Sequence, residues 1–265
     1  MKQRKLKYSL DDPMVTILTC LLAFLTLGAL FAGLTGGHRI HKVELDAAFG
    51  GSNKGYTGYI SEAEINEKTV NALEQLLKMD DRFEVYRTHP AGSEAAVADS
   101  AAKIEDDSPD IALSIHGGWD PDENLSGTRV YTDLAGRKGE GEAKKFAAAV
   151  VKAFSLDDWQ ASANYLYYHE QSDGTYTVEV TDASAQQTES ETETPVTWTI
   201  LEKTDVPCVI VEQFFISNKS DIGRWDNPDG YQMIAEKYYS ALCDYFSIEE
   251  RTFEEKTEEK TEKEG

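Results

Sequence analysis

Short apolar segments alternate with longer amphipathic ones along most of this 265-residue chain, and this alternation restricts the fold more than any other feature. Segments rich in Val, Ile and Leu predict strands at 42–46, 83–88, 110–115, 128–131, 198–201 and 206–211. The segments between them predict helices at 61–79, 93–104, 140–154 and 230–246. We therefore expect a single α/β domain, in which a mostly parallel sheet carries helices on both faces.

Two local signals refine this prediction. Ser61 and Glu64 form an S-x-x-E capping box, which predicts the start of the first helix. Residues 157–196 interrupt the alternation with nine acidic and no basic residues. Within this acidic insert, 164–169 and 175–181 predict a hairpin, and the Ser/Thr/Glu/Gln run at 184–195 predicts disorder.

An apolar run near the N-terminus predicts a membrane anchor. Residues 14–34 contain no charge and no proline, and they are long enough to cross the roughly 30 Å hydrocarbon layer. A cleaved signal peptide is the alternative, but the run exceeds the usual apolar region and no A-x-A site follows it. Basic residues before the run place 1–13 in the cytoplasm. We expect a single-pass cell-membrane protein with 35–247 outside the cytoplasm and a charged, disordered tail at 248–265.

Charge and cysteine content exclude several classes of protein. The chain has 48 acidic and 26 basic residues and a net charge of -22, which argues against nucleic acid as a partner. No C-x-x-C pair is present, so any metal must be held by histidines and carboxylates. Cys20 falls in the predicted membrane span, and we expect Cys208 and Cys243 to be buried free thiols.

Polar residues follow several of the predicted strands, at the edge of the sheet where ligands bind in open parallel folds. These segments are the loop at 47–51, His89 with Pro90, His116 with two glycines, and Glu212 with Gln213. The sequence therefore predicts a functional site at the carboxyl ends of the strands. Trp119, Trp159 and Trp225 could stack on sugars, but single tryptophans near loops are too common to indicate this by themselves.

Five segments, in this order, resemble motifs of the zinc-dependent N-acetylmuramoyl-L-alanine amidases of the Amidase_3 type. The most specific is VPCVIVEQFFISN at 206–218, which is similar to the family's P-x-V-L-V-E-x-x-F-I-S-N. The others are VELDAAFGG at 43–51, SEAEIN at 61–66, IALSIH at 111–116 and YQMIA at 231–235. The resemblance extends from about Lys42 to Phe246 without the acidic insert, and it implies a protein that cuts peptidoglycan between the sugar and the stem peptide.

The resemblance also implies roles for individual residues. In the family, two histidines and a glutamate hold the zinc ion, which leaves an open position for water and substrate. Glu62 and His116 match two of these ligands, and Glu212 matches the general acid/base. Phe49 stands at the position of the first ligand and has no donor atom. His89, after the second strand, is a possible substitute, and His169 in the insert is another.

Two functions follow from this pattern. The first is zinc-dependent hydrolysis of the amide between muramic acid and L-alanine. The second is a catalytically degenerate relative that binds peptidoglycan at the membrane, or regulates an active amidase or another protein partner. Each site residue also has an ordinary explanation: Glu62 suits a helix N-terminus, His116 a hydrogen-bonded core, and Glu212 a structural ion pair.

Overall fold

The computed structural model describes residues 39–93, 96–133, 139–155, 159–170, 176–182 and 199–253. The chain divides into two compact units, 1–39 and 40–265, and the description below concerns the second. The predicted membrane span at 14–34 and the predicted disordered run at 184–195 lie outside the described residues. Among the residues that are described, no helix has the length and apolar character needed to cross a bilayer.

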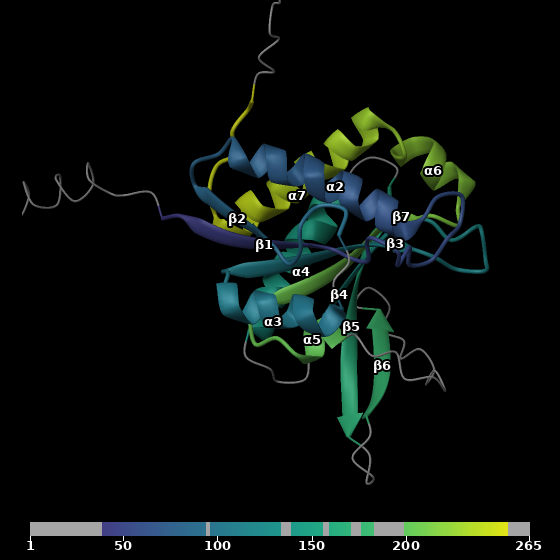
Figure 1. The fold of residues 1–265 in the computed structure, drawn as a ribbon, viewed down its shortest axis with the longest axis horizontal. Helices are drawn as coiled ribbons and strands as arrows, with labels where there is room; N and C mark the ends of the chain where they lie inside the picture. Colours follow the sequence, from purple (N-terminus) through teal and green to yellow (C-terminus); the bar gives the residue numbers. More distant parts are fainter. Residues whose placement is uncertain are drawn as a thin grey trace, which may run out of the picture. The chain divides into compact units, whose positions relative to one another are not determined.

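The described part of the second unit contains seven strands and six helices in one α/β arrangement (Figure 1). The strands are β1 (His41–Ala47), β2 (Phe83–Arg87), β3 (Ile111–Gly118), β4 (Thr128–Asp133), β5 (Ala161–Glu170), β6 (Tyr176–Asp182) and β7 (Cys208–Phe215). The helices are α2 (Glu62–Lys78), α3 (Val97–Asp107), α4 (Glu140–Phe154), α5 (Thr199–Glu202), α6 (Lys219–Trp225) and α7 (Pro228–Phe246). Together they confirm the predicted single α/β domain.

The strands form one sheet in the order β2-β1-β3-β7-β4-β5-β6. β2, β1, β3 and β7 run parallel to one another, as predicted. β4 pairs with β7 in the antiparallel sense and with β5 in the parallel sense, and β5 and β6 form the hairpin predicted for the acidic insert. The sheet is therefore mostly parallel, with its reversal at the β7–β4 boundary.

One predicted strand is wrong. Residues 198–201 were expected to extend the sheet, but Thr199–Glu202 form the short helix α5. Ile200 and Leu201 are neighbours in sequence, yet both are buried in the same apolar cluster. Adjacent residues of a strand point to opposite faces, whereas one helical turn lets both side chains face the sheet.

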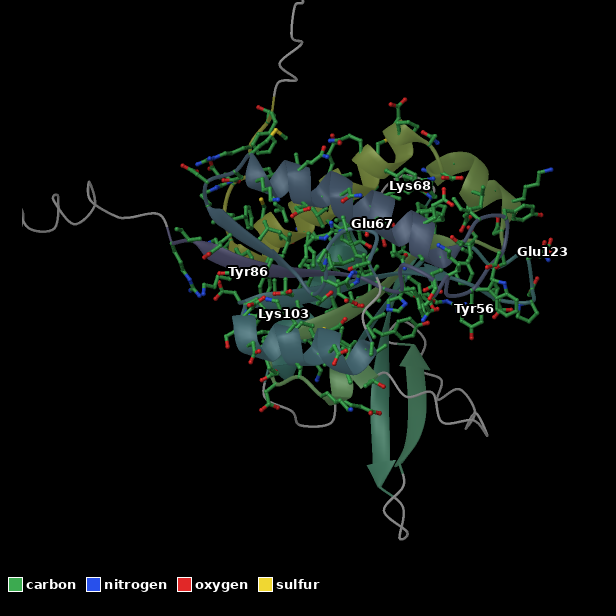
Figure 2. The ribbon with its side chains drawn as sticks, viewed as in Figure 1. Tyr56, Glu67, Lys68, Tyr86, Lys103 and Glu123 are labelled. Atoms are coloured by element: carbon green, nitrogen blue, oxygen red, sulfur yellow. The ribbon has the colours of Figure 1, made fainter. Side chains whose placement is uncertain are left out.

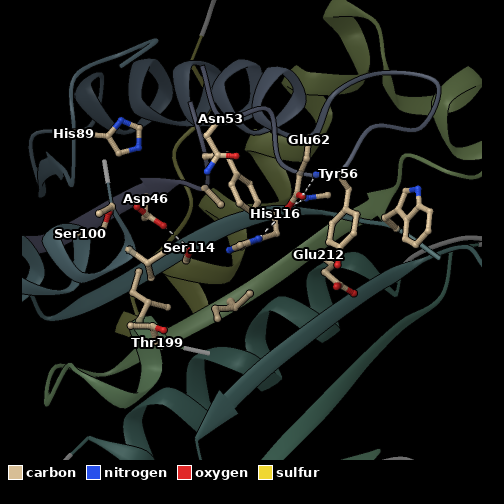
Figure 3. A pocket seen from close by; sticks show the side chains of 18 residues that line it. Asp46, Asn53, Tyr56, Glu62, His89, Ser100, Ser114, His116, Thr199 and Glu212 are labelled. Atoms are coloured by element: carbon tan, nitrogen blue, oxygen red, sulfur yellow. Dashed lines mark hydrogen bonds and ion pairs between the residues drawn. The ribbon is translucent and has the colours of Figure 1, made fainter. Parts of the chain in front are cut away.

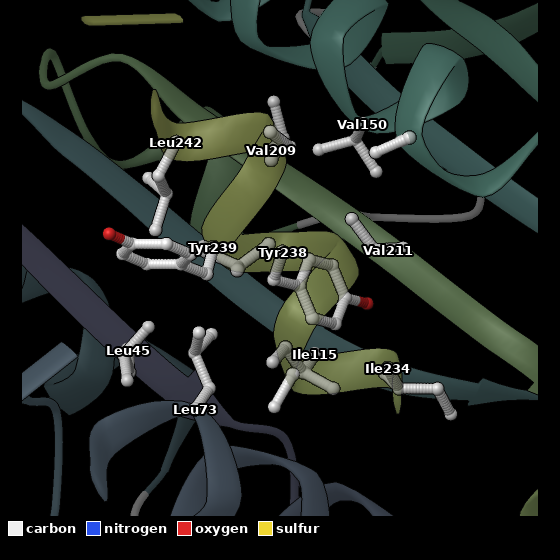
Figure 4. Packing of buried hydrophobic residues seen from close by; sticks show 14 of the residues in the cluster. Leu45, Leu73, Ile115, Val150, Val209, Val211, Ile234, Tyr238, Tyr239 and Leu242 are labelled. Carbon is white, nitrogen blue, oxygen red and sulfur yellow. The ribbon is translucent and has the colours of Figure 1, made fainter. Parts of the chain in front are cut away.

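The period-two alternation of the central strands divides the core into two layers. Leu45, Ile115 and Val211 point to the face covered by α2, α4 and α7 (Figure 4). Residues that alternate with them, including Ala112 and Ile210, pack under α3 and α5 on the other face. Cys208 and Cys243 are buried free thiols, as predicted. Cys243 belongs to the first cluster and Cys208 to the second, so the two lie on opposite sides of the sheet.

The start of α2 differs from the predicted capping box. Helix α2 does begin after Ser61, but the Ser61 side chain makes no capping hydrogen bond, and Glu64 pairs with Lys68 at 2.8 Å. The backbone of the preceding loop caps the helix instead: Tyr56 O accepts from Glu62 N at 2.9 Å, and Lys54 O accepts from Ala63 N at 3.2 Å. The loop after β1 is thereby held against the helix terminus.

The chain after α7 packs against the domain over a short distance. Ile248 and Phe253 are partly buried against the main apolar cluster, and Arg251 Nη1 lies 2.7 Å from Asp81 Oδ1. The domain therefore extends to at least residue 253, beyond the predicted boundary at 247. The reason is local: the segment carries apolar and basic residues that match an apolar and acidic surface, which its overall composition does not reveal.

A buried ion pair fastens this end of the fold. Asp80 is fully buried, and its carboxylate accepts hydrogen bonds from Arg82 Nη2 at 2.6 Å and from the Tyr239 hydroxyl at 2.9 Å. Arg251 Nη1 lies 3.1 Å from its other oxygen. Burial alone would raise the pKa of Asp80, but the hydrogen bonds from Arg82 and Tyr239 outweigh burial and lower the pKa to about 2.

Replacing Asp80 by Asn should lower the free energy of unfolding by about 3 kcal/mol at pH 7, because the buried Arg82 guanidinium loses its counter-charge. Since the folded pKa lies below the unfolded one, the native pair is fully stabilising above about pH 5 and loses this effect as the pH falls towards 2. Urea denaturation of the full-length protein in mild detergent at pH 7, 4 and 3 measures both effects.

Asp81→Asn is the matched control, because the Asp81 side chain is 77% exposed and its pair with Arg251 is worth at most about 1 kcal/mol. Equal stability losses for the two variants, or an unchanged acid dependence in Asp80→Asn, would contradict the assigned role of Asp80.

Candidate functional site

The two-layer arrangement brings two predicted site residues, His116 and Glu212, to one face of the sheet, together with Asp46 and Ser114, which were not singled out from the sequence. Asp46 pairs in register with Ser114, and His116 with Glu212, so all four side chains alternate with the apolar residues that face α2 and α7. They lie at the carboxyl ends of β1, β3 and β7, as expected for an open parallel sheet (Figure 3). A cavity of about 620 Å³ opens at this edge, and Phe49, Glu62 and His89 also line it.

Glu62 is the first residue of α2 and is only 2% exposed. Its Oε1 accepts from the backbone N–H of Gly117 at 3.3 Å and lies 3.0 Å from His116 Nδ1. Its Oε2 accepts from the backbone N–H of Tyr56 at 3.1 Å. Both oxygens of this buried carboxylate are thus satisfied by the protein, in addition to the favourable position at a helix N-terminus.

His116 faces several carboxylates. Burial alone would lower the pKa of its imidazole, but the hydrogen bond and charge of Glu62, with smaller contributions from Asp46 and Glu212, raise the pKa above its ordinary value. His116 and Glu62 therefore form an ion pair whenever the ring is protonated.

Phe49 occupies the loop position that the family resemblance assigns to a zinc ligand. Its ring meets the His116 ring edge-on, with the ring centroids 5.8 Å apart. Phe49 has a φ of 69°, which is uncommon for a non-glycine residue and stores strain in this loop. Gly55 allows this packing, because a Cβ atom there would lie 2.6 Å from the Phe49 ring and 2.8 Å from Glu62 Oε2.

This donor set does not fit a catalytic zinc ion. Glu62 and His116 supply two donor atoms, whereas such sites take three from the protein and keep one position open. Across the described ranges, no group of three or more His, Cys, Asp or Glu side chains could hold a metal ion. The resemblance assigns the family's first ligand to the position of Phe49, whose apolar ring has no lone pair to offer.

Neither predicted substitute lies in a ligating position. His89 is buried, and both of its ring nitrogens contact backbone carbonyl oxygens: Nε2 lies 2.9 Å from Ala47 O and Nδ1 lies 3.2 Å from Pro90 O. For His169, the strand register decides. Ser162 on β5 pairs with Arg129 on β4, which pairs with Glu212 at the site, and β5 leads away from the site after Ser162. His169 follows Ser162 by seven residues, which places its backbone roughly 23 Å along the strand at about 3.3 Å per residue.

Glu212 lies at the boundary between β7 and the antiparallel β4. The Tyr131 hydroxyl donates to Glu212 Oε2 at 3.1 Å, and Arg129 is its register partner across the sheet. Burial raises the pKa of Glu212 above its ordinary value, although the charge of Arg129 and the hydrogen bond from Tyr131 oppose this shift. A carboxyl group with a raised pKa at the wall of a cavity is suited to proton transfer.

Several residues that support the site were not singled out from the sequence. Asn66 Nδ2 donates to Ala48 O at 2.8 Å and thereby holds the loop before Phe49. Gln213 links Asn66 to Thr69 in the same buried chain of hydrogen bonds. The signal was present, because Asn66 and Gln213 lie within the resembling segments 61–66 and 206–218.

The comparisons with known proteins agree with the resemblance seen in the sequence. The family model described as N-acetylmuramoyl-L-alanine amidase, Amidase_3, matches residues 43–244. No curated protein sequence gives a significant match.

Solved structures share the fold at low sequence identity. The catalytic domain of CwlV, an N-acetylmuramoyl-L-alanine amidase from Bacillus (Paenibacillus) polymyxa var. colistinus, is 16% identical with a TM-score of 0.59, covering 79% of this chain and 100% of that one. Ami1 from Mycobacterium smegmatis is 15% identical with a TM-score of 0.60, covering 80% and 99%. The CwlD amidase of Clostridioides difficile, solved in complex with the GerS lipoprotein, is 14% identical with a TM-score of 0.58, covering 79% and 100%.

The structural matches establish the fold, and the family match spans most of the chain and includes every residue of the candidate site. This protein belongs to the N-acetylmuramoyl-L-alanine amidase family.

Proposed function

We propose that this protein binds the muramoyl–L-alanine junction of peptidoglycan in the cavity at the carboxyl ends of β1, β3 and β7, and that it does not hydrolyse this amide with zinc. The observation that carries the proposal is the apolar ring of Phe49 against His116, which is paired with Glu62, at the position that the resemblance assigns to the family's first zinc ligand. It is a proposal for a degenerate active site on a retained family scaffold.

The chemistry of the cavity supports binding of an amide. An amide presents one hydrogen-bond acceptor and one donor, and the wall of the cavity offers both the imidazole of His116 and the carboxylates of Asp46 and Glu212. Ser114 and Thr88 donate to Asp46 at 2.6 Å each, which holds its carboxylate in place. Such preorganised polar groups in a partly apolar cavity are typical of small-ligand sites.

Hydrolysis of the same amide is the second candidate, and Glu212 favours it. Its raised pKa and its place on the cavity wall are those expected of a general acid/base. Any metal would then need a third donor from outside the residues that the structure describes. Zinc would supply a lowered pKa for bound water and polarisation of the amide carbonyl.

Phe49→His separates the two candidates. We expect the full-length wild-type protein in mild detergent to bind soluble muropeptides without turnover and to hold less than about 0.1 equivalent of zinc, because two ligands do not retain the ion. Phe49→His should bring zinc towards one equivalent and produce measurable release of stem peptide, since histidine tolerates the positive φ of this position. Metal analysis by mass spectrometry and chromatography of digested muropeptides give the readouts.

Phe49→Leu is the matched control, because it removes the aromatic ring without adding a donor atom, and it should gain neither zinc nor activity. Stoichiometric zinc and turnover in the wild-type protein, both abolished in His116→Ala, would refute the hypothesis of a degenerate active site and establish hydrolysis. Failure of the wild-type protein to bind any muropeptide would refute the proposed function.

We also propose that residues 14–34 anchor the protein in the cell membrane with the domain outside the cytoplasm. The uncharged run and the basic residues that precede it support this. The anchor would keep a strongly acidic domain near anionic wall polymers that its own charge does not attract. Peptidoglycan binding without zinc at the membrane suits a role in regulating an amidase or another envelope protein. The CwlD amidase, which shares this fold, was solved in complex with the GerS lipoprotein, so a protein partner has a precedent among structures of this fold.

Fractionation of cells that produce the full-length protein tests the anchor. We expect the protein in the membrane fraction, resistant to extraction by carbonate and by high salt, with the domain accessible to protease added outside protoplasts. Replacing Leu21 and Leu22 by Arg should abolish stable insertion, because each charge near the middle of a span costs about 3 kcal/mol. A wild-type protein released by salt, or a domain protected from external protease, would contradict the proposal.

A further inference from the structure

An exposed pair of aromatic rings extends the site beyond the cavity already described. Tyr56 and Trp119 stack in parallel, with centroids 5.0 Å apart and an interplanar angle of 6°. They are 58% and 39% exposed, whereas the other two tryptophans weighed from the sequence, Trp159 and Trp225, are buried. Both Tyr56 and Trp119 line the main cavity.

Trp119 also lines a second hollow, of about 330 Å³, with Tyr59, Asp120 and Glu123 among its other walls. Because one side chain borders both spaces, the two hollows adjoin at Trp119. Tyr56 and Glu123 lie at the same end of the molecule, near the carboxyl ends of the central strands (Figure 2). A ligand that fills the main cavity therefore lies beside the aromatic pair, with the second hollow next to it.

The backbone holds this surface in place without a ligand. Tyr59 N donates to Ile216 O at 3.0 Å, and Asp120 N donates to Ser217 Oγ at 3.1 Å, so both loops are fastened to the residues after β7. Gly58 packs so closely that a Cβ atom would lie 2.2 Å from Ile216 O. A rigid aromatic surface costs little ordering entropy when a ligand binds.

The composition of the second hollow indicates the chemical class of the ligand. Its lining contains Asp120 and Glu123 and no basic residue, so phosphate and carboxylate groups are repelled. Neutral pyranose rings suit such a surface, because their C–H faces pack on aromatic rings while their hydroxyl and amide groups donate to carboxylates. An amine would be attracted to the same acids, but Glu123 is exposed and such attraction is weak in physiological salt.

We propose that Tyr56, Trp119 and the second hollow form a saccharide subsite that binds the N-acetylated sugars of the glycan strand next to the muramoyl unit. This inference rests on the proposed function and deepens it: the main cavity binds the junction of sugar and peptide, and the aromatic pair with the second hollow binds the neighbouring sugars. Recognition then spans the chain of sugars and does not depend on the retained zinc-site residues alone.

The test measures binding of full-length protein in mild detergent to the N-acetylglucosamine tetramer and to peptide-free glycan strands. We expect Trp119→Ala to weaken glycan binding by roughly tenfold, because the stacking surface is lost, and Tyr56→Ala to weaken it as well. Trp119→Phe should retain most of the affinity, since a flat ring remains. Met233→Ala, at a 44% exposed position on α7, is the control and should bind like wild type.

Equal glycan binding in wild type, Trp119→Ala and Tyr56→Ala, with unchanged thermal unfolding, would overturn the subsite. Displacement of the bound tetramer by a free amine such as lysine at physiological salt would overturn the assignment to sugars. His116→Ala separates this inference from the proposed function, because it should weaken binding of muropeptides while leaving the tetramer unaffected. Muropeptide binding that depends on His116 but not on Trp119 refutes the subsite alone, whereas no binding of either ligand refutes both.

Discussion

The packing of the central strands against α2, α4 and α7 is the interaction on which the rest of the structure depends. Leu45, Ile115 and Val211 commit one face of the sheet to this layer, so the residues that alternate with them must face the other side. There, α3 and the short α5 leave room for a cavity at the carboxyl ends of the strands. The position of His116 and Glu212 is a consequence of the apolar core on the opposite face.

The pairing of Glu62 with His116 holds these two side chains of the site in place through contacts within the protein. A buried carboxylate is costly unless it is paired and hydrogen-bonded, and Glu62 meets both conditions through His116 and two backbone N–H groups. Phe49 closes the space beside them and Gly55 makes room for its ring. These contacts are the physical basis of the proposed degenerate site.

The aromatic pair at the rim illustrates how a weak sequence signal gains meaning in the fold. Trp119 alone was one tryptophan among several, and Tyr56 carried no signal at all. Their loops are far apart in sequence and meet because both are fastened to Ile216 and Ser217 after β7. Only then do the two rings stack into one exposed pair beside a cavity, with an outer face of each ring left uncovered by the other.

The sequence by itself determined the fold class, the family and the residues of the candidate site, because strand alternation and short motifs are local properties of the chain. It did not predict α5 correctly, since four residues are too short for periodicity to distinguish a strand from a helical turn. Only the tertiary structure decided that β4 runs antiparallel to β7 and that His89 contacts backbone carbonyl groups. It also decided how far His169 lies from the site. The reason is physical: which donor atoms meet depends on strand order and register across long separations, and these are set by the packing of the whole core.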